Sequence, residues 1–345
     1  MKIKTIIFAI ITLAFLFCLV VFPNVATSSA AKGLGLCSTV IIPSLFPFMA
    51  CCLILFETKF LEKLTEKIEP ITNKVFSLSS CEFSVFLLSL IGGYPVGAKL
   101  VERLYSQGVL AKVKAETMLL YCVNSGPSFV VIAVGAKMLQ NQNLGYILLC
   151  SNTIASIILA ICSSLFLKRT KLRLKGRKTT FSFSESIIKS TFEASGLVLN
   201  ICALVILFSC LYGIIDFVFI KSPIKDILLS LLEITTAIAY SHKNIYIVSF
   251  LLGFAGFCVH FQVLSVSKSI NISFLKFLIF RFMHGILSAF ITFLLLKIFK
   301  VTVPTISFNS SVNLVPTKYT TLFSVALILL SFLFILTTKK SSKTI

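Results

Sequence analysis

Three short segments combine glycine, proline and polar side chains within long apolar runs, at residues 91–99, 124–128 and 253–262. The first segment has three glycines and one proline between positions 92 and 97, a poor composition for a helix interior. Such a turn exposes backbone amides, and a helix that starts at Pro95 would direct its positive end toward them. The segment could therefore hold an anionic group. A simple turn between two helices explains it as well.

The second segment reads Asn-Ser-Gly-Pro-Ser and lies in the middle of an apolar run. Polar residues near the centre of a bilayer are costly unless they contact protein partners or water. Pro127 also removes one helical hydrogen bond, which frees a carbonyl near the side chains of Asn124 and Ser125. These features favour a substrate site or a pore lining, and the alternative is a kink that serves only packing.

The third segment contains His260 and Gln262, the next apolar run contains Arg281 and His284, and Glu233 precedes both. Ionisable groups within membrane segments are candidates for function. The alternative is a structural lock in which Glu233 pairs with Arg281 or His260.

The candidate substrate-binding residues come from these three segments and from the region around Glu233. They are Gly92, Gly93, Tyr94, Pro95, Lys99, Asn124, Ser125, Gly126, Ser128, Glu233, Thr235, Gly256, His260 and Gln262. We expect no catalytic residue, because no hydrolase, zinc-protease or nucleotide-binding pattern occurs. We also expect no metal ligand or cofactor, because the 11 cysteines form no C-x-x-C pair. The protein is therefore not expected to be an enzyme.

The composition places these segments in a membrane. Of the 345 residues, 57% are hydrophobic and 13% are charged, about half the charged fraction of a soluble domain. The formal net charge is +20, but the basic residues cluster between apolar runs. This is the pattern of the positive-inside rule, so nucleic acid is not an expected partner and a lipid bilayer is.

The apolar runs predict an all-α polytopic membrane protein with about 8–10 membrane segments. Clear spans are expected at residues 6–22, 34–56, 115–134, 144–167, 197–220, 274–299 and 320–336. The first resembles a signal peptide, but its length favours an uncleaved transmembrane helix. Residues 75–96 and 224–266 are interrupted by Gly, Pro, Ser and Thr, which is tolerated at membrane depth only beside protein or a wet cavity. We therefore expect these two segments to be broken or re-entrant helices.

Charge in the loops predicts the orientation and the division of the chain. Residues 168–178 carry seven basic side chains and should be cytoplasmic, as should residues 59–74 and 99–114. The basic C-terminus also favours the cytoplasm, which conflicts with a purely re-entrant segment at 224–266, so the number of crossings there and the side of the C-terminus stay open. The expected units are residues 1–32 (N-terminal transmembrane helix and loop), 33–167 (first membrane repeat), 168–183 (basic loop), 184–300 (second membrane repeat) and 301–345 (C-terminal helix and basic tail).

A common spacing suggests that the two repeats are related. Gly35 and Gly196, Gly92 and Gly253, and Pro95 and Gly256 are each separated by 161 positions. Loop charge gives the first helix of each repeat opposite directions across the membrane. Two halves of opposite orientation, each with an interrupted helix, are typical of inverted-repeat transporters. The alternative is two unrelated halves with incidental glycines.

The same motifs resemble the sporulation integral membrane protein YlbJ family, within the nucleoside-recognition (Gate-domain) group. The resemblance rests on residues 42–48 (IPSLFPF), 93–99 (GYPVGAK), 124–127 (NSGP), 233–235 (EIT) and 253–262, in this order. It implies a multi-pass protein of endospore formation in the outer forespore membrane, and a role in passing dipicolinate to the forespore for cortex formation.

Three functions are therefore compared. The first is a transporter or channel for a small organic anion. The second is a membrane scaffold that recruits other sporulation membrane proteins through its basic loop, and the third is a nucleoside-type transporter.

Overall fold

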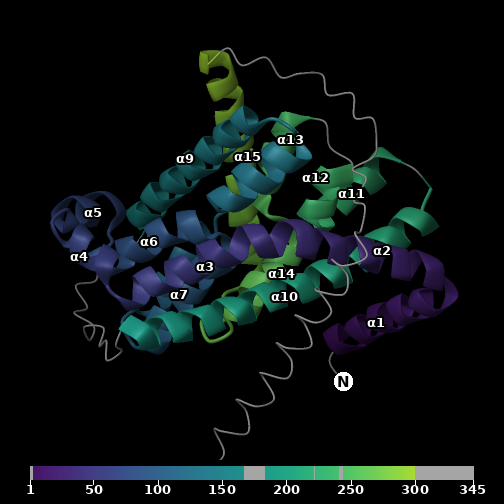
Figure 1. Cartoon of the computed structure of the whole chain (residues 1–345), viewed down its shortest axis with the longest axis horizontal. Helices are drawn as coiled ribbons and strands as arrows, with labels where there is room; N and C mark the ends of the chain where they lie inside the picture. Colours follow the sequence, from purple (N-terminus) through teal and green to yellow (C-terminus); the bar gives the residue numbers. More distant parts are fainter. Residues whose placement is uncertain (1–2, 167–182, 221, 241–243, 300–345) are drawn as a thin grey trace, which may run out of the picture.

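The computed structural model describes residues 3–166, 183–220, 222–240 and 244–299 (Figure 1). The described chain is helical and contains no strand. Its elements are α1 (Ile3–Val21), α2 (Pro23–Leu36), the π-helical turn η1 (Cys37–Ile41), α3 (Ile42–Glu57), α4 (Phe60–Glu66), α5 (Glu69–Phe76), α6 (Ser80–Gly92), α7 (Tyr94–Ser106), α8 (Lys112–Tyr121), the π-helical segment η2 (Ser128–Met138), α9 (Gln142–Phe166), α10 (Phe183–Val218), α11 (Pro223–Leu232), α12 (Ile234–Tyr240), α13 (Ile245–Phe254), α14 (Gly256–Val266) and α15 (Phe274–Phe299).

Long apolar helices confirm the predicted class, an all-α polytopic membrane protein. Within the described residues, five helical stretches are long and apolar enough to cross a membrane, and a sixth is possible if α5 and α6 are taken together. The five are Pro23–Glu57, Gln142–Leu165, Ser184–Val218, Ile245–Val266 and Phe274–Phe299. The predicted span at 320–336, the basic tail and most of the basic loop lie outside the described residues.

One predicted span is wrong as a continuous helix. Residues 115–134 form two helices, because α8 ends at Tyr121 and η2 begins only at Ser128. Pro127 lacks a backbone N–H and Gly126 is a weak helix former, so the helical hydrogen bonds are interrupted between Tyr121 and Ser128. The same run is buried inside the protein rather than exposed to lipid.

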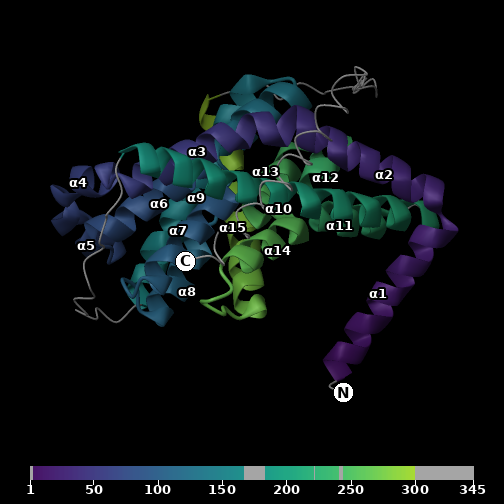
Figure 2. The same cartoon turned by 60° about the horizontal axis from the view of Figure 1, so that its bottom comes forward.

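Two long helices form a central antiparallel pair, α2–η1–α3 and α10 (Figures 1 and 2). A Cβ on Gly33 would lie 2.8 Å from Ser209 Oγ, and a Cβ on Gly213 would overlap Ser29 Oγ. Since early residues of one helix meet late residues of the other, the two helices run in opposite directions. Small residues at such contacts allow close backbone approach, which is how helices associate in membranes. The opposite directions are those that an inverted repeat requires.

Two helical hairpins pack beside this pair. In the first hairpin, α6 and α7 reverse at Gly93, whose φ of +87° suits glycine. The arms pack tightly, since a Cβ on Gly97 would lie 2.6 Å from Ser89 Cβ. In the second hairpin, α11 and α12 reverse at Glu233. The predicted re-entrant character of residues 75–96 thus corresponds to a hairpin that turns at Gly93.

Each hairpin is followed by a broken helix, and the tip of the hairpin contacts the break. A Cβ on Gly126 would lie 2.8 Å from Ile91 O and 3.0 Å from Gly93 N, at the tip of the first hairpin. A Cβ on Gly256, beside the break between α13 and α14, would lie 3.3 Å from Leu231 O at the second tip. Each half therefore reads long helix, hairpin, broken helix, long helix.

This order supports a repeat but not the predicted glycine register. The spacing of 161 positions pairs the first hairpin, which turns at Gly93, with the second broken helix, which breaks at Ala255. The structure instead pairs Gly93 with Glu233 as hairpin tips, and Gly126 with Gly256 as glycines at the breaks. The extra helices α4 and α5 lengthen the first half, so no single spacing relates the two halves.

Candidate functional site

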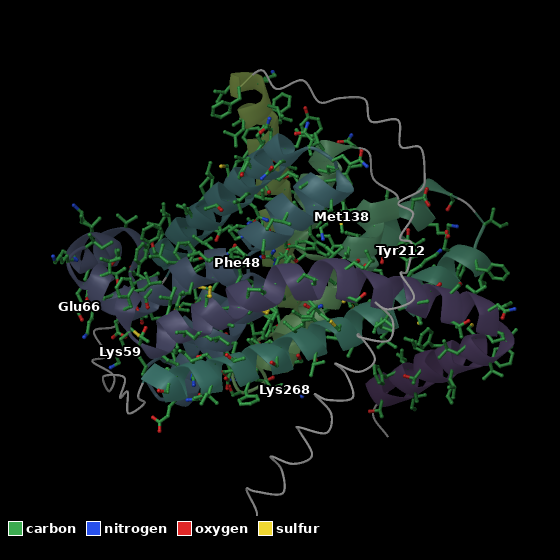
Figure 3. The ribbon with its side chains drawn as sticks, viewed as in Figure 1. Phe48, Lys59, Glu66, Met138, Tyr212 and Lys268 are labelled. Atoms are coloured by element: carbon green, nitrogen blue, oxygen red, sulfur yellow. The ribbon has the colours of Figure 1, made fainter. Side chains whose placement is uncertain are left out.

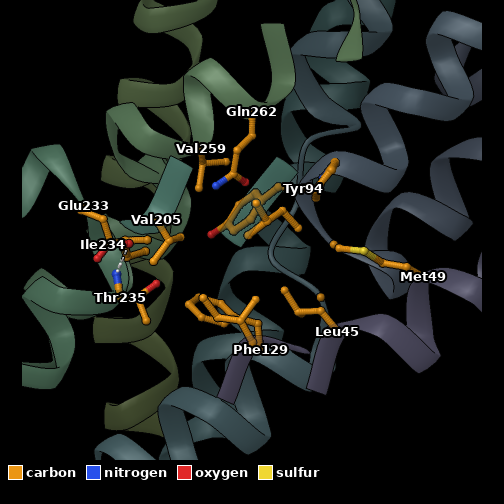
Figure 4. Close-up of a pocket in the computed structure, with 15 residues that line it drawn as sticks. Leu45, Met49, Tyr94, Phe129, Val205, Glu233, Ile234, Thr235, Val259 and Gln262 are labelled. Carbon is orange, nitrogen blue, oxygen red and sulfur yellow. Dashed lines mark hydrogen bonds between the residues drawn. The ribbon is translucent and has the colours of Figure 1, made fainter. Parts of the chain in front are cut away.

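A buried cavity lies where the two hairpin tips and the two broken helices meet the central pair (Figure 4). Its free volume of about 30 Å³ has room for about two water molecules. The lining residues are Ile41, Leu45, Met49, Gly93, Tyr94, Pro95, Gly126, Phe129, Ile201, Val205, Glu233, Ile234, Thr235, Val259 and Gln262. Both halves of the chain contribute, so the cavity is a shared site.

Helix N-termini converge on this cavity. Gly93 and Pro95 lie at the start of α7, Gly126 lies just before η2, and Thr235 lies in the first turn of α12. The first backbone N–H groups of a helix have no partner within the helix, and the helix dipole adds partial positive charge there. At α12 these donors are already taken, because Thr235 N and Thr236 N bind the carboxylate of Glu233. The starts of α7 and η2 therefore provide the donors for a polar or anionic group, without a basic side chain in the lining.

Glu233 is the acidic residue in the lining, and its carboxylate is occupied. Its two oxygens accept hydrogen bonds from Thr235 N at 2.9 Å and Thr236 N at 2.5 Å. This carboxylate therefore caps the N-terminus of α12 and holds the tip of the second hairpin. The alternative in which Glu233 pairs with Arg281 or His260 is wrong for the described residues, because neither approaches the carboxylate as an ion-pair partner.

Arg281 instead joins the two broken helices. Its guanidinium donates hydrogen bonds to Val123 O (2.5 Å), to Phe254 O (3.4 Å) and to Gly253 O, and it contacts His284 Nδ1 at 2.9 Å. Val123 follows α8, while Gly253 and Phe254 end α13. The last carbonyls of a helix lack intrahelical partners and carry partial negative charge. A fully buried arginine thus satisfies two helix ends at once.

Tyr94 adds a second link between the halves. Its hydroxyl donates to Leu252 O at 2.7 Å, in the last turn of α13, and its ring lies across the cavity (Figure 4). The ring also packs edge-on toward Phe129, with centroids 6.5 Å apart. The tip of the first hairpin is therefore tied to the broken helix of the second half.

Asn124 and Ser125 of the first break bond to residues of the neighbouring helices. Asn124 Nδ2 donates to Ser89 Oγ at 3.1 Å and to Tyr121 O at 2.8 Å, while Asn152 Nδ2 donates to Ser125 Oγ. These bonds hold the break against α6 and α9. Three buried oxygens, Asn124 Oδ1, Asn152 Oδ1 and Ser128 Oγ, have no partner in the described part of the chain.

The structure brings half of the predicted site residues to the cavity. Those in the lining are Gly93, Tyr94, Pro95, Gly126, Glu233, Thr235 and Gln262. The others lie around it. Gly92 packs against Val96 within the first hairpin, and Gly256 lies against the second tip. Asn124, Ser125 and Ser128 lie at the first break.

Two predicted site residues lie away from the cavity. Lys99, in the middle of α7, pairs with Glu102 at 3.7 Å and with Glu193 at 3.5 Å. His260 lies among the rings of four phenylalanines, and its Nδ1 contacts Gly256 O. The apolar lining residues and Asn152 were not among the predicted site residues. Asn152 is a polar residue within an apolar run, and this feature would have indicated it.

These features define the class: a helical membrane protein in which paired hairpins and paired broken helices enclose a buried site. The chain is similar to sporulation integral membrane protein YlbJ of Bacillus subtilis (strain 168), with 24% identity over 342 aligned positions that cover 86% of this chain and 84% of the relative. This similarity over most of both chains confirms the predicted resemblance to the YlbJ family. No family model and no solved structure matches the chain.

Proposed function

We propose that this protein moves a small organic anion across a membrane during sporulation, and that the cavity between the hairpin tips is its binding site. The observation that carries the proposal is the meeting of two hairpin tips and two helix breaks at one buried cavity. Irregular backbone at membrane depth is tolerated where it lines a solute site, and transporters with inverted repeats bind their substrates at such breaks.

The chemistry of the lining favours an aromatic anion over a sugar-like solute. The starts of α7 and η2 supply amide donors, Tyr94 and Phe129 supply ring surfaces, and Thr235 and Gln262 supply polar side chains. The carboxylate of Glu233 accepts hydrogen bonds from two amides, whose dipoles partly offset its negative charge, so it opposes an anion less than a carboxylate without such bonds would. Dipicolinate, an aromatic ring with two carboxylates, is the substrate that the family resemblance implies.

The cavity must widen for this substrate. A free volume of about 30 Å³ holds water but not an aromatic dicarboxylate. The hairpin tips are the proposed moving parts, because each contacts a break through glycine. Their opening would break the hydrogen bond from Tyr94 to Leu252 O. In the proposed cycle the tips separate to admit the anion on one side and close again before the other side opens.

Uptake into sealed vesicles tests the function. Vesicles that contain the purified protein should accumulate labelled dipicolinate above the level of protein-free vesicles, and an excess of unlabelled nucleoside should not compete. Competition by nucleoside would favour the nucleoside-type alternative. Absence of uptake, together with loss of protein partners when the basic residues at 168–178 are neutralised, would favour the scaffold and contradict the proposal.

A further inference from the structure

The helices α4 and α5 lie outside the membrane bundle and differ from it in direction. They connect α3 to α6 at one end of the molecule (Figures 1 and 2). The axis of α5 makes an angle of 74° with that of α6, across a break of a few residues. α5 therefore does not continue the direction in which α6 enters the bundle.

One face of this pair is docked on the protein. Thr65 Oγ1 donates to Ser80 O at 3.0 Å, and Thr72 Oγ1 donates to Leu78 O at 3.1 Å. Both threonines are buried. These two bonds hold α4 and α5 against the start of α6, so the face of each helix opposite its threonine is directed away from the protein.

The outward face is an apolar stripe. Its residues are Phe60 (58% exposed) and Leu64 (60%), four positions apart in α4, and Ile71 (64%) in α5. Ile68 (41%) and Val75 (37%) lie four and three positions from Thr72, so they line the edge of the stripe next to the docked face. No other part of the described chain covers this stripe, and exposed apolar residues in a row indicate an interaction surface.

Lysines flank the stripe, and acidic residues lie away from it. In α4, Lys63 directly precedes Leu64, whereas Glu62 and Glu66 are each two positions from Leu64 and so lie on the other side of the helix. In α5, Lys74 is three positions from Ile71 and so lies beside it, whereas Glu69 is two positions from Ile71 and lies on the other side of the helix. Figure 3 shows Lys59 and Glu66 at this outer end of the molecule. A lysine beside an apolar face can bury its methylenes and extend its ammonium to the headgroups.

We propose that α4 and α5 form an interfacial anchor, in which Phe60, Leu64 and Ile71 insert between headgroups and Lys63, Lys67 and Lys74 bind anionic phospholipid. The three lysines are exposed and form no ion pair with the described residues. An apolar face flanked by lysines is the composition of a helix that lies in the interface of an anionic leaflet. The occupant is thus the lipid of the membrane that the protein already spans.

The absence of tryptophan from the sequence permits a direct test of insertion. In Ile71→Trp, the fluorescence of the introduced side chain reports the environment of the stripe. In Asn73→Trp it reports the environment of the opposite, exposed side of the same helix. In vesicles of anionic and zwitterionic phospholipid that carry bromine on their acyl chains, we expect strong quenching of Ile71→Trp and weak quenching of Asn73→Trp. Equal quenching of the two variants would overturn the insertion.

Lipid selectivity is tested in the Ile71→Trp background. Bromine placed only on the anionic lipid should quench more than bromine placed only on the zwitterionic lipid. Replacing Lys63, Lys67 and Lys74 with glutamine should remove this preference. Each replacement should lower the ratio of quenching by the anionic lipid to quenching by the zwitterionic lipid by up to about five-fold, the contribution of one lysine at an anionic surface. Equal quenching by both lipids would show that anionic headgroups are not bound. Quenching that falls as protein density rises would show that a second copy of the protein covers the stripe. Either result would contradict the proposal.

Discussion

Replacing Arg281 with methionine should lower the apparent melting temperature of the purified protein by about 5 °C or more. The arginine satisfies Val123 O, Gly253 O and Phe254 O, which lie at the ends of two broken helices. Each buried carbonyl left without a donor costs about 1–3 kcal/mol. Removal of the buried charge also recovers some desolvation free energy. This gain is smaller than the cost of three unpaired carbonyls, because the partial negative charges of two helix ends already stabilise the guanidinium. A loss of about 3 kcal/mol corresponds to such a shift in a protein of this size.

Two further variants separate this role from a general effect of charge. Arg281→Lys retains the charge, but its single ammonium cannot reach both helix ends, so we expect an intermediate melting temperature. Lys297→Met removes a basic residue that is exposed near the end of the same helix α15, and it should melt like the wild type. A wild-type melting temperature for Arg281→Met would show that the arginine does not hold the breaks together.

The second large effect is expected for Gly97→Ala. A Cβ at this position would overlap Cys122 O and lie 2.6 Å from Ser89 Cβ. Cys122 O is a backbone atom at the end of α8, so the first hairpin and the first broken helix would have to separate. Overpacking of this kind costs about 1–3 kcal/mol and more where backbone must move. We expect a lower melting temperature and a lower yield of folded protein in detergent.

Gly35→Ala is the matched control. Nothing lies within 4 Å of a Cβ at Gly35, which is also within a helix. The same substitution there should be neutral or stabilising by up to about 1 kcal/mol, because alanine is the better helix former. If Gly97→Ala and Gly35→Ala melted at the same temperature, the close approach of α7 and α8 at Cys122 would be wrong.

The sequence allowed the membrane class and several of the breaks to be predicted. Lipid is the only solvent compatible with apolar runs of this length and low charge, and the glycine and proline residues at positions 92–95 and 126–127 favour interruption of a helix. Seven of the predicted site residues line the cavity for the same reason: a break at membrane depth needs partners, and the other breaks are the partners available.

What could not be predicted is which break meets which hairpin. The glycine spacing of 161 positions ignored α4 and α5, and it paired a hairpin with a broken helix. The partner of Arg281 could not be predicted either. Charge alone suggests the carboxylate of Glu233, whereas Arg281 binds backbone carbonyls. That choice depends on where the ends of α8 and α13 lie in space, and on two amides that occupy Glu233 first.

The most direct test of the central claim is the initial rate of dipicolinate uptake by vesicles that contain Gln262→Leu. Gln262 lines the cavity, and its amide donates only a weak bond to Cys258 Sγ at 3.4 Å, so leucine should disturb the fold little. The control, Asn200→Leu, removes an amide that bonds Ser265 and does not line the cavity. We predict at least a ten-fold lower rate for Gln262→Leu, about the loss of one hydrogen bond to a charged substrate, and a nearly normal rate for Asn200→Leu. Equal rates for the two variants at equal protein levels would contradict a solute pathway through this cavity.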